Sequence, residues 1–372
     1  MSVPAQADID VVSFGCRLNL VESEAMRLAA AEAGHSGIVV VNTCAVTAES
    51  VRQARQTIRR ISREKPERRI IVSGCASETE RAKFADMPEV SAILDNDAKT
   101  LPATWQALSH NAEDWRARAH GAEDPSMPRF SPQPPPVGRI AGHTRAFLAI
   151  QNGCDHRCTF CVIPYGRGPS RSISADAAIA QAQRLVELGH QEIVLTGVDL
   201  TSWGGGLAGE PKLGRLVRAI LKAAPGLRRL RLSSLDCIEA DEDLMIALAE
   251  EERLAPHLHL SLQAGDDMIL KRMKRRHLRR DAIEFCARVR KIRPDIVFGA
   301  DLIAGFPTET EEMAANTLRL VDDCGLTHLH VFPYSPREKT PAARMPQVAP
   351  ASRNRRAKNL REAGERALVR HL

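Results

Sequence analysis

The first hundred residues repeat one pattern three times, and this repeat limits the possible fold more than any other feature. Each copy is a short apolar run rich in β-branched residues, a turn that holds a cysteine, and a segment with helical spacing. The sequence predicts strands at 9–14, 38–42 and 70–73, and helices at 21–33, 48–65 and 78–84. Alternating strands and helices of this kind form an open parallel sheet.

Three cysteines come directly after these strands, at Cys16, Cys44 and Cys75. Ligand sites in open α/β sheets lie at the carboxyl ends of the strands, so we expect the three thiols to converge on one site. The alternative is three buried structural cysteines, because cysteine is often buried.

The sequence contains nine cysteines, and the expected cellular compartment indicates which roles they can have. No apolar run approaches the roughly 20 residues that span a bilayer, and the N-terminus lacks a basic region followed by an apolar stretch. We therefore expect a cytoplasmic protein with no membrane partner. In that reducing compartment cysteines serve as metal ligands or catalytic thiols more often than as disulfides.

The rest of the chain divides into a linker and a second domain. We expect the first domain at 1–110 and a linker at 111–138, because its proline-rich stretch cannot sustain a helix or a central strand. Strands are expected at 147–151, 192–197, 230–234, 258–263, 296–305 and 329–333. Helices are expected between them, at 176–188, 213–223, 241–251, 281–292 and 311–323, and a basic helix ends residues 139–372. Six such steps, rather than the eight of a closed barrel, predict an open, partial (β/α)6 barrel.

The loop after the first of these strands carries Cys154, Cys158 and Cys161 in a Cys-x3-Cys-x2-Cys pattern. Thiolates this close together on a glycine-led loop can hold three corners of one iron–sulfur cluster. Zinc is disfavoured, because a structural zinc site takes four ligands and His156 stands at a poor spacing for the fourth. Three cysteines on a [4Fe–4S] cluster leave one iron open.

This motif, with Phe160 before its last cysteine, resembles the radical S-adenosylmethionine (SAM) superfamily, in which the open iron chelates SAM. Longer matches look like the methylthiotransferases within that superfamily. They are Gln151-Asn152-Gly153-Cys154-Asp155, Leu195-Thr196-Gly197-Val198, Ala304-Gly305-Phe306-Pro307, and the N-terminal Gly15-Cys16, Asn42-Thr43-Cys44 and Ser73-Gly74-Cys75.

The resemblance implies an α/β protein with two [4Fe–4S] clusters and SAM as cofactors. It assigns one cluster to Cys16, Cys44 and Cys75, and the catalytic cluster to Cys154, Cys158 and Cys161. The residues it implies for SAM binding are Phe160, Gly197, Ser234, Gln263, Asp301 and Gly305. It also implies a low-potential electron donor of the flavodoxin or ferredoxin type, and a sulfur donor.

Within the family, the chain looks most like enzymes that methylthiolate carbon 2 of N6-threonylcarbamoyladenosine at tRNA position 37, beside the anticodon. Alternatives are N6-isopentenyladenosine in tRNA and a ribosomal-protein aspartate. A rival from another class is a non-catalytic iron–sulfur protein for electron transfer or RNA binding. Clusters for electron transfer usually have four cysteine ligands, so two three-cysteine sites disfavour that rival.

A net charge of +6, concentrated in residues 139–372, suggests an RNA partner, although such a charge also serves solubility. The residues expected to contact tRNA are Arg167, Arg171, Lys271, Arg272, Lys274, Arg275 and Arg276. A solvated helix face is the alternative for the run at 271–276. The family's small C-terminal RNA-binding β-barrel is expected to be absent, because nothing strand-rich follows residue 358; either the sequence is truncated or RNA is held elsewhere.

Overall fold

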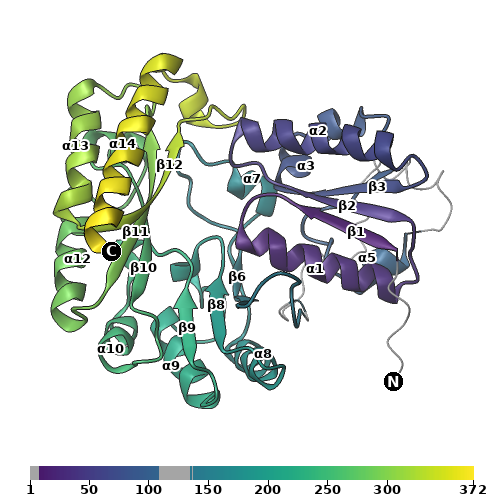
Figure 1. The fold of residues 1–372 in the computed structure, drawn as a ribbon, viewed down its shortest axis with the longest axis horizontal. Helices are drawn as coiled ribbons and strands as arrows, with labels where there is room; N and C mark the ends of the chain where they lie inside the picture. The colour runs from purple at the N-terminus through teal and green to yellow at the C-terminus, as the bar shows by residue number, and fades with distance from the viewer. Residues whose placement is uncertain (1–7, 109–134, 136) are drawn as a thin grey trace. The chain divides into compact units, whose positions relative to one another are not determined.

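The computed structural model describes residues 8–108, 135 and 137–372, and the chain divides into two compact units (Figure 1). Unit 1 comprises Met1–His143 and Val162–Pro169, and unit 2 comprises Thr144–Cys161 and Ser170–Leu372. Val162–Pro169 thus belongs to unit 1, although it directly follows the Cys-x3-Cys-x2-Cys motif. Most of the expected linker at 111–138 lies outside the described residues.

The described part of unit 1 contains a parallel sheet in the order β1-β2-β3-β4. Its strands are β1 (Ile9–Ser13), β2 (Ile38–Thr43), β3 (Arg69–Gly74) and β4 (Ala92–Ile93). The first three strands are in register, so that Ser13 lies opposite Asn42, and Asn42 opposite Ser73. The expected open parallel sheet is therefore confirmed, with a short fourth strand that the sequence pattern did not indicate.

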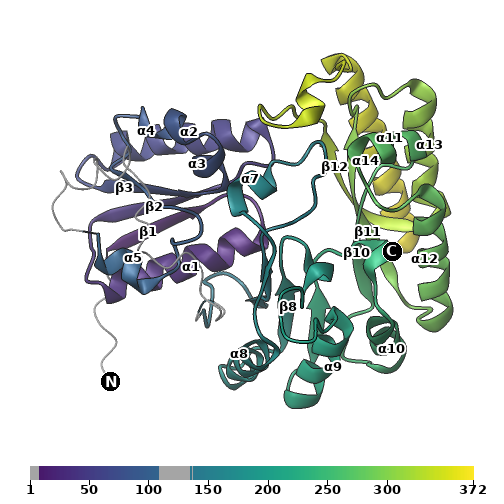
Figure 2. The ribbon, with the colours of Figure 1, turned by 180° about the vertical axis from the view of Figure 1, so that it is seen from behind.

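Helices cover both faces of this sheet (Figure 2). They are α1 (Arg17–Glu32), α2 (Ala48–Glu64), α3 (Cys75–Thr79), α4 (Arg81–Ala85) and α5 (Pro102–Gln106). Val40 and Ile71 pack against Met26 and Trp105 on the side of α1 and α5, whereas residues of α2 and α3 pack on the other face. Burial on both faces explains why these strands are continuous apolar runs.

Unit 2 contains the expected partial barrel. Its described parallel strands are β5 (Ala146–Ala149), β8 (Glu192–Thr196), β9 (Arg229–Leu232), β10 (His257–Gln263), β11 (Val297–Ala304) and β12 (Leu326–Pro333). They form two parallel sheets, β5-β8-β9 and β10-β11-β12. Isolated parallel bridges, Leu230 with Leu254 and Leu235 with Leu260, join the two sheets into one curved wall.

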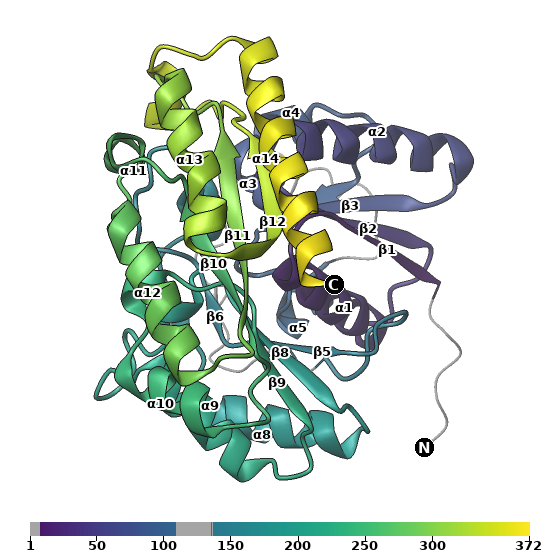
Figure 3. The ribbon, with the colours of Figure 1, turned by 60° about the vertical axis from the view of Figure 1, so that its left-hand side comes forward.

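Helices lie outside this wall, as Figure 3 shows for α12, α13 and α14. The helices between and after the strands are α8 (Ala175–Glu187), α9 (Leu213–Ala223), α10 (Glu242–Glu250), α11 (Asp267–Met273), α12 (Arg279–Ile292), α13 (Glu311–Asp323) and α14 (Pro350–His371). Side chains of Ser174, Asp241 and Thr310 accept hydrogen bonds from backbone N–H groups in the first turns of α8, α10 and α13. These caps stabilise the first turns of the helices, at the positions where the spacing of apolar residues changes to that of a helix.

Short elements that the sequence analysis did not predict complete the units. The two-residue strands β6 (Gln151–Asn152) and β7 (Arg171–Ser172) pair antiparallel in unit 2. Helix α7 (Ile163–Arg167) belongs to unit 1. Among the described residues, no helix combines the length and the apolar character needed to cross a bilayer.

The packing of α9 against α10 gives a test of the fold. A Cβ at Gly214 would lie 1.9 Å from the backbone nitrogen of Leu244. We therefore expect Gly214→Ala to destabilise unit 2 by about 2–3 kcal/mol through overpacking, despite alanine's better helix propensity. The matched control is Gly364→Ala in α14, where the three atoms nearest to the Cβ all belong to the side chain of Leu329, at 3.0–3.2 Å. Urea unfolding should separate the two variants; equal stabilities would contradict this packing.

Candidate functional site: two cysteine triads

The N-terminal triad lies at one edge of the sheet in unit 1. Cys16 is the N-cap of α1, Cys44 follows β2, and Cys75 is the first residue of α3, directly after β3. Because the three strands are parallel and in register, their carboxyl ends meet at this edge. Burial raises the pKa of the Cys44 thiol to about 11, and the negative charges of Cys75 and Cys16 add to this shift. The structure thus brings the three predicted thiols together.

Two glycines make room for this triad. A Cβ at Gly15, where φ is +93°, would lie 2.7 Å from both Cβ and Sγ of Cys44. A Cβ at Gly74, where φ is +103°, would lie 2.4 Å from the carbonyl oxygen of Thr43. Both positions combine the left-handed backbone that favours glycine with a close approach of neighbouring atoms. The donor set of three sulfurs fits a soft iron–sulfur cluster, which leaves one metal position without a protein ligand.

A buried charge cluster adjoins the triad, and the sequence analysis missed most of it. The Arg167 guanidinium contacts both carboxylate oxygens of Glu22, at 2.7 and 2.9 Å, and its Nε donates to Cys75 Sγ at 3.2 Å. Lys99 Nζ lies 2.7 Å from Glu22 as well. Burial opposes ionisation of Glu22, but the charges of Arg167 and Lys99 outweigh it and lower the pKa to about 2.

This position corrects the expectation that Arg167 contacts tRNA. Its side chain is 1% exposed and is hydrogen-bonded inside unit 1. The signal that could have indicated the site is the i, i+3 spacing of Asn19 and Glu22 in the helix after the first cysteine, because both then share a helix face.

The second triad lies on the loop that follows β6 in unit 2. Gln151 fixes this loop: its Nε2 donates to the carbonyl of Gly153 at 2.8 Å, and its Oε1 accepts from the backbone nitrogens of Val198 and Asp199. A Cβ at Gly197 would lie 2.9 Å from the Gln151 side chain, so Gly197 leaves the room that this anchor needs. One side chain thereby connects the cysteine loop to the end of β8.

The three thiols of this loop differ in exposure. Cys154 is buried, whereas Cys158 and Cys161 are half-buried. Burial raises the pKa of Cys154 to about 12, and the negative charges of Asp199, Cys161 and Cys158 add to it. The three sulfurs therefore lie within electrostatic reach of one another, and this donor set also fits an iron–sulfur cluster with one open metal position.

Charged side chains surround the second triad. The Arg275 Nη1 atom lies 3.7 Å from Cys158 Sγ, while Nη2 donates to Asp236 at 2.9 Å and to the carbonyl of Ser261 at 2.6 Å. His156 Nε2 lies 2.9 Å from Asp199, and its hydrogen bonds to Asp199 and Glu239 raise its pKa to about 10. The ligand atoms of Cys154, His156 and Asp199 lie within 4.8 Å of one another, so this histidine stands beside the triad.

Most of the expected SAM-contacting residues lie at the ends of successive barrel strands. Gly197, Ser234, Gln263 and Gly305 stand at or just after the carboxyl ends of β8, β9, β10 and β11. This is the rim on which barrel enzymes carry their active sites. Phe160 packs against an apolar cluster that includes Ala264 and Phe306.

Asp301 differs from the other expected SAM contacts, because it lies within β11 and is engaged by two histidines. His259 Nε2 is 3.0 Å and His330 Nδ1 is 3.2 Å from Asp301 Oδ1. Burial of the carboxyl group would raise its pKa, but the two histidines outweigh this and lower it to about 2. Sequence spacing did not indicate this His–Asp–His cluster, since its members come from three different strands.

The basic run at 271–276 divides into buried and exposed members. Arg275 is only 8% exposed, which corrects the expectation that it contacts tRNA. Lys271, Lys274 and Arg276 are exposed, and Arg272 and Arg171 are half-buried. Arg276 is also paired with Glu239. The two lysines are therefore the members of this run best placed to meet phosphate.

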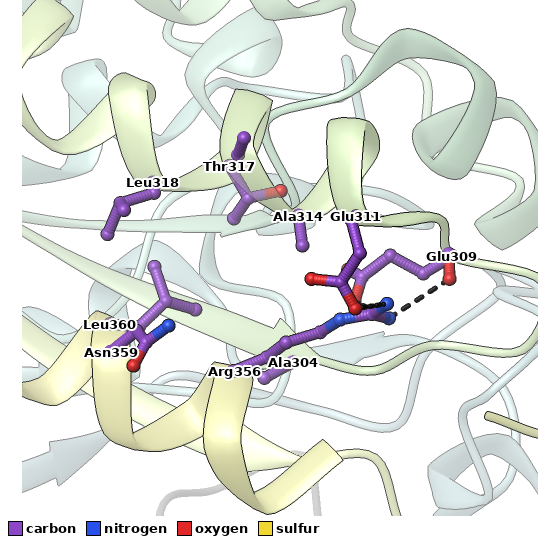
Figure 4. Close-up of a pocket in the computed structure, with 10 residues that line it drawn as sticks. Ala304, Glu309, Glu311, Ala314, Thr317, Leu318, Arg356, Asn359 and Leu360 are labelled. Atoms are coloured by element: carbon purple, nitrogen blue, oxygen red, sulfur yellow. Dashed lines mark hydrogen bonds and ion pairs between the residues drawn. The ribbon is translucent and has the colours of Figure 1, made fainter. Parts of the chain in front are cut away.

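A pocket in unit 2 lies between the end of β11 and helices α13 and α14 (Figure 4). Arg356 extends along it and pairs with Glu309 at 2.9 Å and Glu311 at 2.7 Å. Glu309 also accepts a hydrogen bond from the backbone nitrogen of Gly305 at 2.9 Å. Because these carboxylates neutralise the arginine and hold the loop after β11, we assign this pocket to the packing of α14 rather than to a ligand.

Comparison with known proteins agrees with both units. Residues 148–321 match the Radical SAM superfamily, and residues 8–95 match the Uncharacterized protein family UPF0004. Threonylcarbamoyladenosine tRNA methylthiotransferase MtaB of Rickettsia prowazekii is 46% identical over 95% of this chain and 82% of its own length. tRNA-2-methylthio-N(6)-dimethylallyladenosine synthase of Erythrobacter litoralis is 34% identical over 91% and 78%.

A solved structure supports the fold. The radical SAM methyltransferase TsrM of Kitasatospora setae, with cobalamin and a [4Fe–4S] cluster bound, superposes with a TM-score of 0.60. It covers 91% of this chain and 77% of its own, with 15% sequence identity. At that identity the likeness concerns the fold alone.

The close approach at Gly15 gives a test of the first triad. We expect Gly15→Ala to displace the Cys44 thiol and to reduce the iron bound by this site after anaerobic reconstitution. The control is Gly34→Ala, which has a similar φ of +79° but nothing within 4 Å of its Cβ, so it suffers only backbone strain of about 1–2 kcal/mol. Iron analysis in a chain that lacks Cys154, Cys158 and Cys161 isolates the site. Equal iron in both variants would contradict the role of Gly15.

Proposed function

The chain belongs to the radical SAM methylthiotransferase family, and we propose that it places a methylthio group on carbon 2 of N6-threonylcarbamoyladenosine in tRNA. The observation that carries the proposal is the pair of three-cysteine sites, one at the sheet edge of unit 1 and one on the loop after β6 in unit 2. The substrate follows from the relatives: identity is 46% with a threonylcarbamoyladenosine enzyme and 34% with a dimethylallyladenosine enzyme.

The reaction needs a radical because carbon 2 of adenine carries an unactivated C–H bond. Acid–base side chains cannot remove that hydrogen, so the reaction requires a cofactor that generates a radical. We propose that Cys154, Cys158 and Cys161 hold a [4Fe–4S] cluster whose open iron binds SAM. When bound, the cluster supplies the electron for reductive cleavage of SAM.

Residues around the second triad position these groups. Gln151 ties the cysteine loop to the turn after β8, and thereby fixes the loop against the rim where Gly197 lies. Arg275 brings positive charge to Cys158, and Asp236 holds that guanidinium in place. Burial would raise the pKa of Asp236, but His277 and the charge of Arg275 outweigh it and lower the value to about 2, so the carboxylate keeps its charge.

The N-terminal triad supplies the second part of the proposal. Cys16, Cys44 and Cys75 would hold another [4Fe–4S] cluster with an open iron, and an exchangeable sulfur would occupy that position. One SAM would supply the methyl group for that sulfur, and a second SAM would supply the radical that removes the hydrogen from carbon 2. Because one cluster must be reduced and the other must be resupplied with sulfur, the proposal implies two partners. They are a low-potential electron donor of the flavodoxin or ferredoxin type and a sulfur donor.

Mass spectrometry of tRNA identifies the substrate. A strain without this gene should lack 2-methylthio-N6-threonylcarbamoyladenosine, and its unthiolated precursor should accumulate. Loss of the methylthio derivative of dimethylallyladenosine instead would favour the substrate of the 34% identical relative. Unchanged tRNA with an altered ribosomal-protein aspartate, or no change at all, would overturn the proposal.

Paired cysteine variants separate the two sites. Cys154→Ala should abolish formation of 5′-deoxyadenosine from SAM, because the radical cluster loses a ligand. Cys44→Ala should retain reductive SAM cleavage but lose tRNA methylthiolation, because the radical then meets no sulfur. On a two-cluster model of about eight irons, either variant should bind about half. Multiple-turnover methylthiolation by Cys44→Ala would remove the N-terminal triad from the reaction.

Salt dependence tests the tRNA contact. Each lysine that binds phosphate releases counterions, so Lys271→Gln and Lys274→Gln should each lower the slope of log K against log salt by about 1. Arg218→Gln on α9 is the control, because this arginine is 43% exposed but paired with Asp243. Binding titrations from 50 to 200 mM salt supply the slopes. Slopes that stay the same in the lysine variants would identify the run at 271–276 as a solvated face.

A further inference from the structure

Arg167 occupies an unusual position for an arginine, fully buried beside a cysteine of the N-terminal triad. Nε donates to Cys75 Sγ at 3.2 Å, and Nη1 donates to Glu22 at 2.7 Å. Nη2 donates to Glu22 at 2.9 Å and to Asn19 at 2.5 Å. Such a planar fork is held in one orientation by its partners. The direction of the N–H group toward the sulfur is therefore fixed by the fold.

Arg167 lies in a buried cluster of charges beside the triad. Arg167 and Lys99 both pair with the buried carboxylate of Glu22. Burial opposes the charge of Arg167, but the interactions with Cys75, Glu22 and Cys16 outweigh it and raise its pKa. Arg167 is therefore a buried cation whose Nε–H group faces a sulfur of the triad.

The segment that carries Arg167 is anchored in unit 1. A Cβ at Gly166 would lie 3.1–3.3 Å from backbone and side-chain atoms of Cys75, so α7 packs closely on the start of α3. Asn96 Nδ2 donates to the carbonyl of Gly166 at 2.6 Å. These contacts hold Arg167 at a fixed place relative to the Cys75 sulfur.

We propose that Arg167 is a positioning residue for the N-terminal site, where its Nε–H group and charge stabilise the reduced form of the cluster held by Cys75. This inference rests on the proposed function, which assigns a cluster to that triad. Hydrogen bonds to ligand sulfurs and nearby charge set the reduction potential of an iron–sulfur cluster. A donor and a positive charge both favour the more negative, reduced state, so Arg167 raises the potential.

The experiment measures that potential directly. In a chain with Cys154, Cys158 and Cys161 replaced by Ala, one cluster remains, and an electron paramagnetic resonance titration reports its potential. We expect Arg167→Gln to lower the ratio of reduced to oxidised cluster at least tenfold at a fixed ambient potential, which equals about 59 mV for a one-electron couple. Arg167→Lys, which keeps the charge but changes the donor, should fall between the parent and Arg167→Gln.

The matched control is Lys99→Gln. It also removes one buried cation from Glu22, but Lys99 donates to Asn42 and Glu22, which are not ligands of the triad. Its loss of thermal stability should therefore resemble that of Arg167→Gln, while its potential stays closer to the parent's. Equal potential shifts in the two variants would overturn the proposal, because Arg167 would then act only as one of two buried charges.

Other outcomes also decide the matter. If Arg167→Gln does not fold, Arg167→Lys preserves the buried charge, and an unshifted potential in that variant would overturn the role of the N–H···S contact. An unshifted potential in a folded Arg167→Gln chain would overturn the inference while leaving the second cluster in place. A parent chain that binds no iron would instead overturn the second cluster of the proposed function, and this inference with it.

Discussion

Parallel pairing of neighbouring strands is the constraint on which both cysteine sites depend. In a parallel sheet every strand ends at the same edge, so turns that are far apart in sequence meet there. Cys16, Cys44 and Cys75 follow β1, β2 and β3 and converge for this reason. In unit 2 the cysteine loop shares its rim with the turns after β8 to β11. If one strand ran in the opposite direction, its turn would lie at the other edge, and a triad would lose a cysteine.

The strands of unit 1 could be predicted from the sequence because buried strands are rich in apolar, β-branched residues. Strands β2 and β3 are covered on both faces and are therefore continuous apolar runs. Such a run can be recognised in the sequence without knowing which strands pair with it. The resemblance to the methylthiotransferases and the partial barrel are confirmed as well. Strand β4 and the β6-β7 ribbon were missed, because two-residue strands are too short to show a period.

Charged residues were harder to predict, because their partners are distant in sequence. Arg167 and Arg275 stand near other basic residues, and that pattern is the same for a surface patch and for buried ion pairs. Glu22 lies 145 positions from Arg167, and Asp236 lies 39 positions from Arg275. Only the folded chain brings each carboxylate to its arginine. Spacing can indicate a metal site whose ligands follow strands, but it carries no sign of a long-range ion pair.

The two arginines show one electrostatic arrangement at two separate triads. Each directs one nitrogen toward a cysteine sulfur, at 3.2 Å for Arg167 and 3.7 Å for Arg275, and each is paired with a buried carboxylate. The carboxylate limits the orientations of the guanidinium and offsets part of the cost of burying it. The cysteine sulfur in front of each arginine then faces an N–H group whose direction is fixed. Arg167 follows Cys161 by six residues, so one short segment carries a cysteine of the second triad and a hydrogen-bond donor to the first.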